Sequence, residues 1–441
     1  MTKQIYPGDR LEIIVSDNGS TDGSVEFISR EYKNVRLLEN RKNLGFALGN
    51  NVALEAARGD FLVLLNNDTA PEPGWLKSLV EVAVKYPDAG LVTGRTQLFY
   101  DQLTLTIQSE NCGTLASGPL PSIHIFGIDH GLPGGTVQYL EGNWELRPQG
   151  RQSAVSRFHG RARIGVPVPR HDREYTIHFS LAADRMAEVP VAVKLFPDDI
   201  TLDHWEISGA KPQNYSLTLL SGVRSRATPV IQNAGSLVFK NGAGRDRGTV
   251  VRDAIYFFEE DRGQFGSEEE VFAGCGANLL LRREMLREVG VFDPNFFMYY
   301  EDTDLSWRAR LKGWKVFYAP QAIIRHIHCG TSQEWSPSFI FYTDRNRLAM
   351  LFKNGTWSSV TREWGGYGLR FLEGIFQLSR DLLRRGKTPH TPWAVSKIRS
   401  KVLFSLFCWL PRLVKERHFI QKTRSVSKAG IDRWLVPLSR S

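Results

Sequence analysis

Residues 61–68, FLVLLNND, join five apolar residues to three polar ones. An unbroken apolar run of this length is typical of a strand that is buried on both faces of a parallel sheet. Asn66 and Asp68 then stand at the carboxyl end of that strand, the edge at which open α/β sheets bind ligands. A carboxylate there suits Mg²⁺ or Mn²⁺, although Asn and Asp also favour a plain turn after a strand.

The segments on either side alternate between strand and helix patterns. Strand patterns occupy residues 11–17, 35–40 and 89–96, and helix patterns occupy 24–32, 45–57 and 75–84. The alternation returns after Pro229, with helices predicted at 282–289 and 303–312 and a strand that begins at Trp314. This order predicts an α/β, Rossmann-like domain in which helices cover a sheet.

Between about Thr104 and Thr228 the helical periodicity is replaced by short alternating strands separated by turn residues. Three of these strands turn one face inward, through Tyr175, Ile177, Phe179, Leu181, Val189, Val191, Val193, Leu195, Tyr215, Leu217 and Leu219. The pattern predicts an all-β sandwich inserted into the α/β domain. Trp144, Trp205 and Tyr139 have the flat faces that stack against sugars, whereas aromatic residues of a sandwich more often belong to its core.

The C-terminal part of the chain is helical and basic. The formal charge of the whole chain is +9, but residues 353–441 hold 18 Lys/Arg against 5 Asp/Glu. In LRFLEGIFQLSRDLLRR (369–385) the apolar residues fall on one broad helical face, with Arg370 and Arg380 on the other side. Such helices suit either an anionic membrane surface or packing against the α/β domain with the basic faces in water. Nucleic acid fits less well, because no base-reading motif accompanies the charge.

Cysteine usage and the absence of several motifs narrow the class of protein. Four cysteines are scattered without a C-x-x-C pair, and no basic-then-apolar signal sequence opens the chain, so we expect a reducing, cytoplasmic compartment. The most apolar run, 402–411, is shorter than the roughly 20 residues that a membrane span needs. No G-x-G-x-x-G follows a strand and no G-x-x-x-x-G-K-[ST] occurs, which excludes a dinucleotide fingerprint and a P-loop.

Two further polar segments are candidates for a binding site. SDNGSTDGS (16–24) follows the strand pattern at 11–17, and helix capping explains its Ser, Thr and second Asp but not Asp17. NLGFALGNN (43–51) opens a helix pattern with two glycines. Asp17 is expected at the same sheet edge as Asp68, because it also stands at the tip of a strand.

FFMYYEDTDLSWRARLKGW (296–314) leads five bulky residues into Glu301, Asp302 and Asp304. Capping and the helix dipole account for two of these carboxylates. The remaining carboxylate fits a general base that lies against the aromatic residues, where burial raises its pKa. Farther along, His326 ends an apolar strand and is either structural or, if it lies near Asp68, part of a metal site.

In their order these segments resemble glycosyltransferase family 2, the inverting, nucleotide-sugar-dependent enzymes of the GT-A fold, and in particular its bacterial rhamnosyltransferase-like branch. The matching segments are EIIVSDNGSTDGS, NLGFALGNN, FLVLLNNDTAPEPGWL, GCGANLLLRREMLREVGVFDPNFFMYYEDTDLSWRARLKGW and YAPQAIIRH. The resemblance implies a GT-A, Rossmann-like nucleotide-sugar-binding domain over residues 1–103 and 229–345. A β-sandwich at 104–228 would interrupt it, and a basic amphipathic helical tail at 346–441 would follow.

The resemblance also implies a role for individual residues. The implied catalytic residues are Asp302, as the base, with Glu301 and Asp304 shaping its site. The implied ligands of Mg²⁺ or Mn²⁺ are Asp68, in the position of the family's D-x-D motif, and His326. The residues implied to bind the nucleotide-sugar are Asp17, Asn18, Asn43, Gly45, Asn66 and Gly276.

The implied activity is that of a metal-dependent hexosyltransferase. The sugar would pass with inversion from a dTDP-, UDP- or GDP-linked donor to a hydroxyl of a saccharide or lipid-linked acceptor, in the synthesis of cell-envelope polysaccharide. The expected location is the cytoplasm or the inner face of the cytoplasmic membrane. A nucleotidyltransferase on a related fold fits less well, because the Glu-Asp pair suits a base for an acceptor hydroxyl.

The start of the chain departs from the family's pattern. Family members normally have a strand and a helix ahead of EIIVSDNGS, and only MTKQIYPGDR precedes Leu11 here. We therefore expect the central strand to be absent, which would leave backbone groups of the flanking strands unpaired. An inactive, truncated carbohydrate-binding homologue is accordingly the alternative hypothesis.

Overall fold

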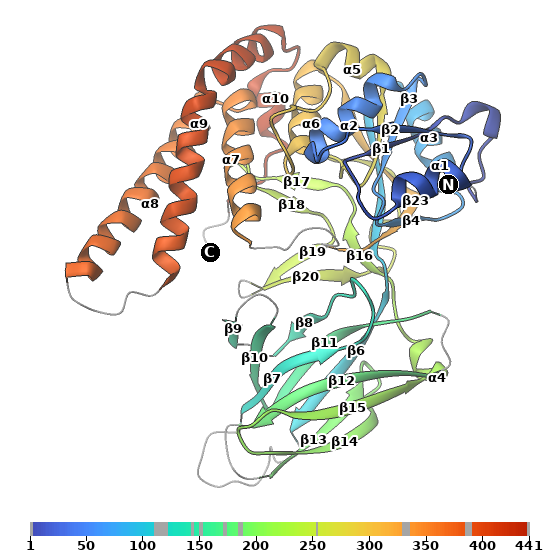
Figure 1. Cartoon of the computed structure of the whole chain (residues 1–441), viewed down its shortest axis with the longest axis vertical. Helices are drawn as coiled ribbons and strands as arrows, with labels where there is room; N and C mark the ends of the chain where they lie inside the picture. Colours follow the sequence, from blue (N-terminus) through green and yellow to red (C-terminus); the bar gives the residue numbers. More distant parts are fainter. Residues whose placement is uncertain are drawn as a thin grey trace.

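The computed structural model describes residues 3–109, 122–142, 145–149, 153–170, 174–183, 188–252, 255–328, 336–383 and 390–438. It has three parts (Figure 1). An α/β domain lies at one end of the long axis and a β-sandwich at the other, and two long C-terminal helices run beside the α/β domain.

The α/β domain is built on a nine-stranded sheet. Its strands are β3 (Phe61–Leu65), β4 (Thr69–Pro71), β5 (Ala89–Leu98), β16 (Val230–Asn233), β19 (Thr249–Arg252), β20 (Ile255–Glu260), β21 (Glu269–Glu270), β22 (Asn278–Arg282) and β23 (Lys315–His326). All ten residues of β5 are buried; β23 runs parallel to it, and β22 and β16 share its other edge. Gly94 permits this close pairing, because a Cβ there would collide with the carbonyl oxygen of Ala322.

β3 differs from its prediction as a strand of a parallel sheet buried on both faces. Within the described sheet it pairs only with β22, in the antiparallel sense, and its residues alternate between buried and half-buried. Its apolar run is continuous because the two faces serve different cores. Leu62 and Leu64 join the main core, whereas Phe61, Val63 and Leu65 pack with α3.

The helices of the α/β domain lie close to their predicted positions. They are α1 (Ser24–Glu31), α2 (Gly45–Ala56), α3 (Trp75–Lys85), α5 (Arg283–Val289) and α6 (Glu301–Lys312), preceded by a short 3₁₀ helix, η1 (Gly8–Arg10). α5 and α6 end at Gly290 and Gly313, whose φ angles are +77° and +100°. Glycine adopts this left-handed conformation without the steric cost that other residues meet, which is why it ends both helices.

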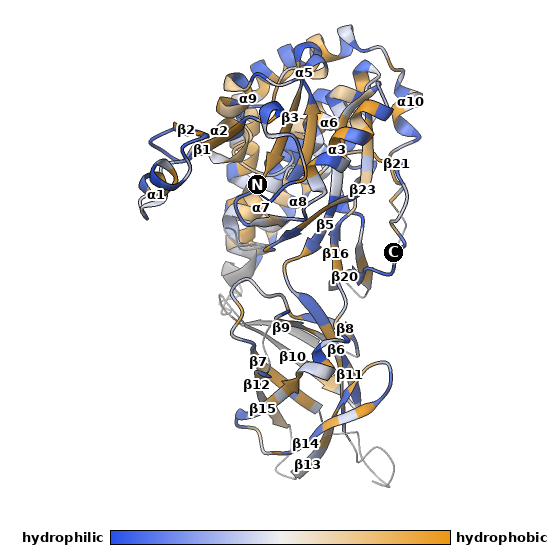
Figure 2. Ribbon diagram, turned by 90° about the vertical axis from the view of Figure 1, so that its right-hand side faces the viewer, coloured by the Kyte–Doolittle hydropathy of each residue, from blue (hydrophilic) through white to orange (hydrophobic). Residues whose placement is uncertain are grey.

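β1 (Ile13–Asp17) and β2 (Val35–Glu39) form a separate, two-stranded parallel sheet. Among the strands that the structure describes, none pairs with the second edge of β1 or of β3. The five residues of β1 are all half-buried. Figure 2 shows β1, β2 and α1 at the margin of the α/β domain.

The inserted domain is a sandwich of two five-stranded antiparallel sheets. Its strands are β6 (Asp101–Ser109), β7 (Ser122–Asp129), β8 (Gln138–Glu141), β9 (Glu145–Gln149), β10 (Ser153–His159), β11 (Arg161–Val168), β12 (Glu174–Ala183), β13 (Glu188–Leu195), β14 (Ile200–Ser208) and β15 (Gln213–Leu220), followed by the short helix α4 (Ser221–Arg224). The predicted inward residues of β12, β13 and β15 line its own core. Trp205 is part of that core, with its ring tilted against that of Phe179, so it is not a free sugar-stacking face. Tyr139 is half-buried and packs against the same core, and Trp144 lies outside the described residues.

The C-terminal helices are not an appended tail. They are α7 (Pro337–Asn354), α8 (Trp357–Leu383), α9 (His390–Thr423) and α10 (Lys428–Asp432), so the boundary predicted at residue 346 falls inside α7. Leu348 of α7 and Leu406 of α9 share one core with Trp307 of α6 and Leu279 of the sheet. Within the described ranges, no helix has the length and apolarity that crossing a membrane would require.

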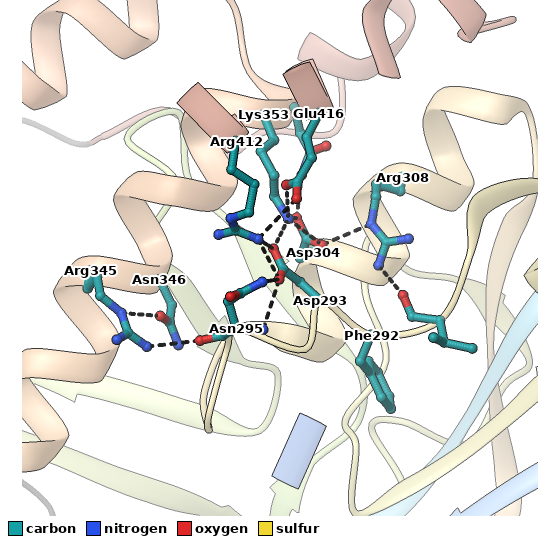
Figure 3. A network of polar contacts seen from close by, with 12 residues as sticks. Phe292, Asp293, Asn295, Asp304, Arg308, Arg345, Asn346, Lys353, Arg412 and Glu416 are labelled. Carbon is teal, nitrogen blue, oxygen red and sulfur yellow. Dashed lines mark hydrogen bonds and ion pairs between the residues drawn. The ribbon is translucent and has the colours of Figure 1, made fainter. Parts of the chain in front are cut away.

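A buried ionic network fastens α6 to α7 and α9 (Figure 3). The Nζ atom of Lys353, on α7, lies 2.7 Å from Asp293 and 3.1 Å from Asp304, and Arg412 of α9 lies 2.8 Å from Asp293. Burial acts to raise the pKa of Asp293, but Lys353 and Arg412 outweigh it and lower that pKa. Burial likewise acts to lower the pKa of Lys353, and the two carboxylates outweigh it and raise that pKa. The network is therefore charged at neutral pH.

Replacing Lys353 by Met should lower the free energy of unfolding by about 3–5 kcal/mol, because two buried carboxylates lose their shared cation. Lys315→Met is the matched control. Its Nζ is 2.7 Å from Asp88, but both side chains are exposed, and such a pair contributes about 1 kcal/mol or less. Urea unfolding at pH 7 measures both changes. Similar losses in the two variants would contradict a special role for Lys353.

Candidate active site

α6 begins after an unusual stretch of backbone. Tyr299 and Tyr300 have φ angles of +70° and +69°. Residues other than glycine enter this left-handed region at a cost of about 1–3 kcal/mol each. Asn346 of α7 holds the stretch in place, since its Nδ2 donates to the carbonyl oxygens of Met298 and Tyr299, each at 2.9 Å. The direction of the first turn of α6 is thus set by a contact with α7.

Asp302, the second residue of α6, is half-buried and is held by main-chain groups. Its Oδ2 accepts a hydrogen bond from the Gly276 N–H at 2.9 Å, and its Oδ1 accepts one from the Thr303 N–H at 2.6 Å. Burial raises the pKa of Asp302 above the ordinary value, while these hydrogen bonds oppose the rise. A fixed, partly exposed carboxylate that is more basic than usual is suited to accept a proton.

The other two acids of this turn lie in different surroundings. Glu301 is 6% exposed, and burial, together with the charge of Asp302, raises its pKa well above the ordinary value. Asp304 is fully buried and accepts hydrogen bonds from Arg308 and from two side chains of α7. The expectation that Asp304 hydrogen-bonds within the site of the base is therefore wrong, because its carboxylate is occupied by the ionic network of Figure 3.

Asp17, Asn18, Asn43 and Gly45 come together at the ends of β1 and α2. Asp17 accepts hydrogen bonds from two backbone N–H groups of the turn that follows β1, at 2.9 and 3.1 Å, and hydrogen bonding from this turn lowers its pKa. Nδ2 of Asn18 donates to the carbonyl oxygen of Gly45 at 3.0 Å, and Oδ1 of Asn43 accepts from the Gly45 N–H at 2.9 Å. The structure thus joins four of the predicted nucleotide-sugar residues in one polar group.

Packing contacts lead from this group to Asp302. The φ of Gly45 is +75°, and a Cβ there would collide with Phe297 of the aromatic run. The next residue, Phe46, donates its N–H to the Phe297 carbonyl oxygen at 2.7 Å. The ring of Phe46 also lies against Gly276, where a Cβ would approach it to 2.9 Å. Gly276 is therefore enclosed between α2 and the carboxylate that it binds, Asp302.

Asp68 and His326 meet as predicted for a metal pair. Nε2 of His326 lies 3.2 Å from Oδ1 of Asp68, which is buried and accepts no hydrogen bond of regular geometry from the described residues. Burial acts to raise the pKa of Asp68, but His326 outweighs it and lowers that pKa. Among the described residues, no group of three or more His, Cys, Asp or Glu side chains is arranged so that it could hold a metal ion. Two protein ligands are enough for Mg²⁺ or Mn²⁺ when a diphosphate supplies the remaining oxygens.

The carbonyl oxygen of Asn66, in the same turn as Asp68, accepts a hydrogen bond from the Thr69 hydroxyl at 2.5 Å.

Gln232 orients the imidazole of His326, a role that the sequence did not indicate. It lies at an irregularity in the pairing of β16 with β5. Its Oε1 is 2.9 Å from Nδ1 of His326, and its Nε2 is 3.0 Å from Nδ1 of His328. Because an amide oxygen only accepts, Nδ1 of His326 donates the hydrogen bond to Gln232, and Nε2 is the ring nitrogen that faces Asp68. A carboxylate oxygen and an imidazole nitrogen that face each other are both ligand types that a divalent cation accepts.

Asp246 is a further acid of the site that sequence reasoning missed. It ends β18 (Gly244–Asp246), which forms a hairpin with β17 (Ser236–Val238). The hairpin is bound on two sides. The Ser236 N–H donates to the Ala273 carbonyl oxygen at 2.8 Å, ahead of the Gly276 loop, and the Gly244 N–H donates to the Tyr300 hydroxyl at 3.1 Å. The surrounding segment, GAGRDRG, has no helix or strand periodicity that would have placed this acid.

Asp246 links the two halves of the site. Its Oδ1 accepts from Nδ2 of Asn233 at 2.7 Å, and Asn233 is the neighbour of Gln232 in β16. Burial raises the pKa of Asp246 to about 6, the charge of Asp302 adds to this rise, and the hydrogen bond from Asn233 opposes it. The Asp68–His326 pair therefore reaches Asp246 through Gln232 and Asn233, adjacent residues of β16, and the charge of Asp302 acts on the pKa of Asp246.

Comparison with known proteins identifies the group to which this site belongs. The sequence model described as "Glycosyl transferase family 2" matches residues 1–135, and the one described as "Glycosyl transferase family group 2" matches residues 213–348. The chain belongs to glycosyltransferase family 2. The chain has the α/β domain that the sequence predicted, with a sandwich inserted into it and a helical region after it.

Two curated relatives match parts of the chain. "Glycosyltransferase AglE" of Haloferax volcanii is 31% identical over 103 residues, which is 23% of this chain and 34% of the relative. "N-acetylglucosaminyl-diphospho-decaprenol L-rhamnosyltransferase" of Mycobacterium tuberculosis is 33% identical over 131 residues, 27% of this chain and 39% of the relative. The matched part of the chain thus spans little more than a third of either relative.

Solved glycosyltransferase structures are similar at a lower level. GalNAc-T7, with UDP, GalNAc and Mn²⁺, is 12% identical with a TM-score of 0.40, covering 90% of this chain and 49% of that one. The mannosyltransferase PcManGT of Pyrobaculum calidifontis, with GDP-Man and Mn²⁺, is 13% identical with a TM-score of 0.34, covering 98% and 72%. Similarity of this degree adds no detail to the site of the family 2 chain.

Replacing Asp246 by Asn should stabilise the family 2 chain by about 1–3 kcal/mol at pH 8. The pKa of Asp246 is about 6 in the folded protein against an ordinary 3.8, so the folded state binds this proton more tightly than the unfolded state does. The wild type therefore loses stability as the pH rises from about 4 to about 6 and does not regain it above, whereas the Asn variant is unaffected. Denaturant unfolding between pH 4 and 8 measures the difference in the free energy of unfolding between the Asn variant and the wild type. This difference should vanish near pH 4.

Asp60→Asn is the control for this experiment, since Asp60 is exposed. It should change stability little at any pH. A stabilisation by Asp246→Asn that is the same at pH 4 and pH 8 would show that ionisation of Asp246 is not its cause.

Proposed function

We propose that this chain is an inverting glycosyltransferase that moves a sugar from a nucleotide-sugar donor to a hydroxyl of a saccharide or lipid-linked acceptor. The observation that carries the proposal is the placement of Asp302. Its carboxylate is fixed by the Gly276 N–H and keeps part of its surface exposed, and Gly276 packs against Phe46 of α2, the helix that begins at Gly45 of the predicted nucleotide-sugar group. Family 2 membership supports glycosyl transfer as the class of reaction.

Asp302 would act as the general base. It would take the proton from the acceptor hydroxyl while that oxygen forms a bond to the anomeric carbon of the donor sugar. The bond from this carbon to the diphosphate oxygen would break on the opposite face, and its electron pair would leave with the nucleoside diphosphate. The configuration at the carbon therefore inverts. Glu301, whose pKa is raised well above the ordinary value, would stay protonated and add no second charge beside the base.

The donor would lie across the opposite half of the site. Asp68 and His326 fit Mg²⁺ or Mn²⁺, and such a cation would offset the charge that develops on the departing diphosphate. The residues proposed to hold the rest of the donor are Asp17, Asn18, Asn43, Gly45, Asn66 and Gly276. The nucleotide is proposed to be dTDP, UDP or GDP.

The acceptor is proposed to belong to cell-envelope polysaccharide synthesis. The Mycobacterium tuberculosis relative is named for a diphospho-decaprenol-linked sugar, which supports a lipid-linked saccharide as one acceptor class. Such an acceptor would place the enzyme at the inner face of the cytoplasmic membrane.

The alternative is an inactive carbohydrate-binding homologue. It is favoured by one observation, the separation of β1 and β2 from the nine-stranded sheet, because β1 carries Asp17 of the proposed donor site. Binding of a nucleotide-sugar without transfer to any acceptor, or absence of nucleotide binding, would support this alternative.

Asp302→Asn should reduce sugar transfer by about 10²–10⁴-fold, because the amide cannot accept the proton. Purified chain would be assayed with a panel of UDP-, dTDP- and GDP-sugars, and binding of the active donor would be measured calorimetrically. Donor affinity should change little, since the base is proposed to touch the acceptor. Asp88→Asn, at an exposed ion pair, is the control. Transfer retained by Asp302→Asn would remove Asp302 from the mechanism.

Gln232→Leu should weaken Mn²⁺-dependent nucleotide binding by about 10–100-fold, because His326 loses the partner that fixes its proton on Nδ1. Asp68→Asn should weaken it at least as much. Titration of UDP, dTDP and GDP in the presence and absence of Mn²⁺ measures the effect without any turnover. His130→Ala, a half-buried histidine of the sandwich, should leave binding unchanged. Metal dependence that is unaltered in both site variants would count against this pair.

A further inference from the structure

The hairpin of α8 and α9 exposes bulky apolar side chains on both helices. Phe376 is 66% exposed and Phe407 73% exposed, values expected of Lys or Glu rather than Phe. The large exposed apolar residues are Trp357, Leu369, Leu372, Ile375 and Phe376 on α8, and Trp393, Phe404, Phe407, Val414 and Phe419 on α9. In Figure 1 the two helices lie side by side at the margin of the molecule, away from the sandwich.

On each helix these residues form a stripe. Leu369, Leu372 and Phe376 are spaced by three and four positions, which places them on one helical face. On α9, Phe404 and Phe407 are three apart, and Trp393 precedes Phe404 by eleven positions, or three helical turns. The exposed apolar residues are therefore ordered and not scattered.

The inward faces of the same helices are already satisfied. Tyr367 of α8 is buried, and Val402 and Leu406 of α9 belong to the main core. The helices approach closely at Gly374, where a Cβ would lie 2.5 Å from the Ser396 hydroxyl. The exposed stripes therefore do not form the contacts that hold these helices in the chain. Apolar surface that is exposed in this way is typical of an interaction site.

Basic side chains accompany the stripe on α9. Lys397, Lys401 and Lys415 are exposed among its aromatic residues. The one acid in the sequence of α9, Glu416, is half-buried and lies 3.7 Å from Lys353. The face that carries Phe404 and Phe407 is therefore apolar and positive, the combination that binds an anionic lipid surface.

We propose that the α8–α9 hairpin docks on an anionic phospholipid surface. Phe404, Phe407, Leu372 and Phe376 enter the boundary between headgroups and acyl chains, about 5–10 Å deep in such interfaces. The lysines of α9 meet the lipid phosphates. A second copy of the chain is a poorer occupant, because two identical positive faces repel each other.

This inference rests on the proposed function only for its purpose, which is to bring the site to a lipid-linked acceptor. Binding to lipid does not require sugar transfer. The two proposals can therefore fail separately.

The test is cosedimentation of the full chain with vesicles of phosphatidylcholine alone or with 30% phosphatidylglycerol. Wild-type chain should bind the anionic vesicles and be released by high salt. The double variant Phe404→Ser/Phe407→Ser should bind at least about tenfold more weakly, because both apolar anchors are lost. Lys397→Gln/Lys401→Gln should lose about tenfold on anionic vesicles only.

Phe27→Ser is the matched control, since Phe27 is also exposed but lies on α1. It should bind like the wild type, and Asp302→Asn should too. The substituted Phe and Lys positions are exposed, so circular dichroism should show unchanged folding in those variants. The proposal is overturned if wild-type chain does not bind anionic vesicles or if the double Phe variant binds equally well. It is also overturned if sedimentation velocity shows that these residues hold two copies together instead.

Discussion

Lys353 places a positive charge beneath the first turn of α6, and the position of Asp302 depends on it. The lysine binds Asp304, two residues beyond Asp302, and Asp293 on the loop that leads into the aromatic run. Separating these groups would leave charges buried without partners, at a cost of several kcal/mol. α6 is therefore locked to α7. Because α7 also supplies Asn346, which holds the left-handed backbone ahead of α6, one helix from the C-terminal part sets the direction of the candidate base.

The titratable groups of the site fall into two environments. Glu301 is buried, Asp302 and Asp246 are half-buried, and burial raises the pKa of each. Asp68 faces His326, and its pKa is lowered. When surroundings push the pKa values of acids apart, the acids with raised values are suited to accept protons. The acids with lowered values are suited to remain charged. Acids held in this way reduce stability, a cost that is common where a protein carries chemistry.

The three parts of the molecule are connected through the site. The chain leaves β5 for the sandwich at β6 and returns through β16, the strand that bears Gln232 and Asn233. The C-terminal helices reach the site from the other side, through Asn346 and Lys353. The sandwich keeps a core of its own, whereas the C-terminal helices share the core of the α/β domain. The sandwich can therefore vary more freely than the helices without displacing the base.

The sequence by itself determined the α/β domain, the inserted sandwich, the turns at Asp17 and Asp68, and the presence of three acids at the start of α6. These features depend on local periodicity, on turn residues and on the glycines that end helices, and each of these signals is carried by residues that are close together in the sequence. Only the tertiary structure decided that Asp304 belongs to Lys353 and not to the base, that Gln232 orients His326, and that Asp246 joins the site. Each of these depends on a residue about 50 or more positions away. The face that a helix turns toward another helix, and the burial that shifts a pKa, exist only once the chain is packed.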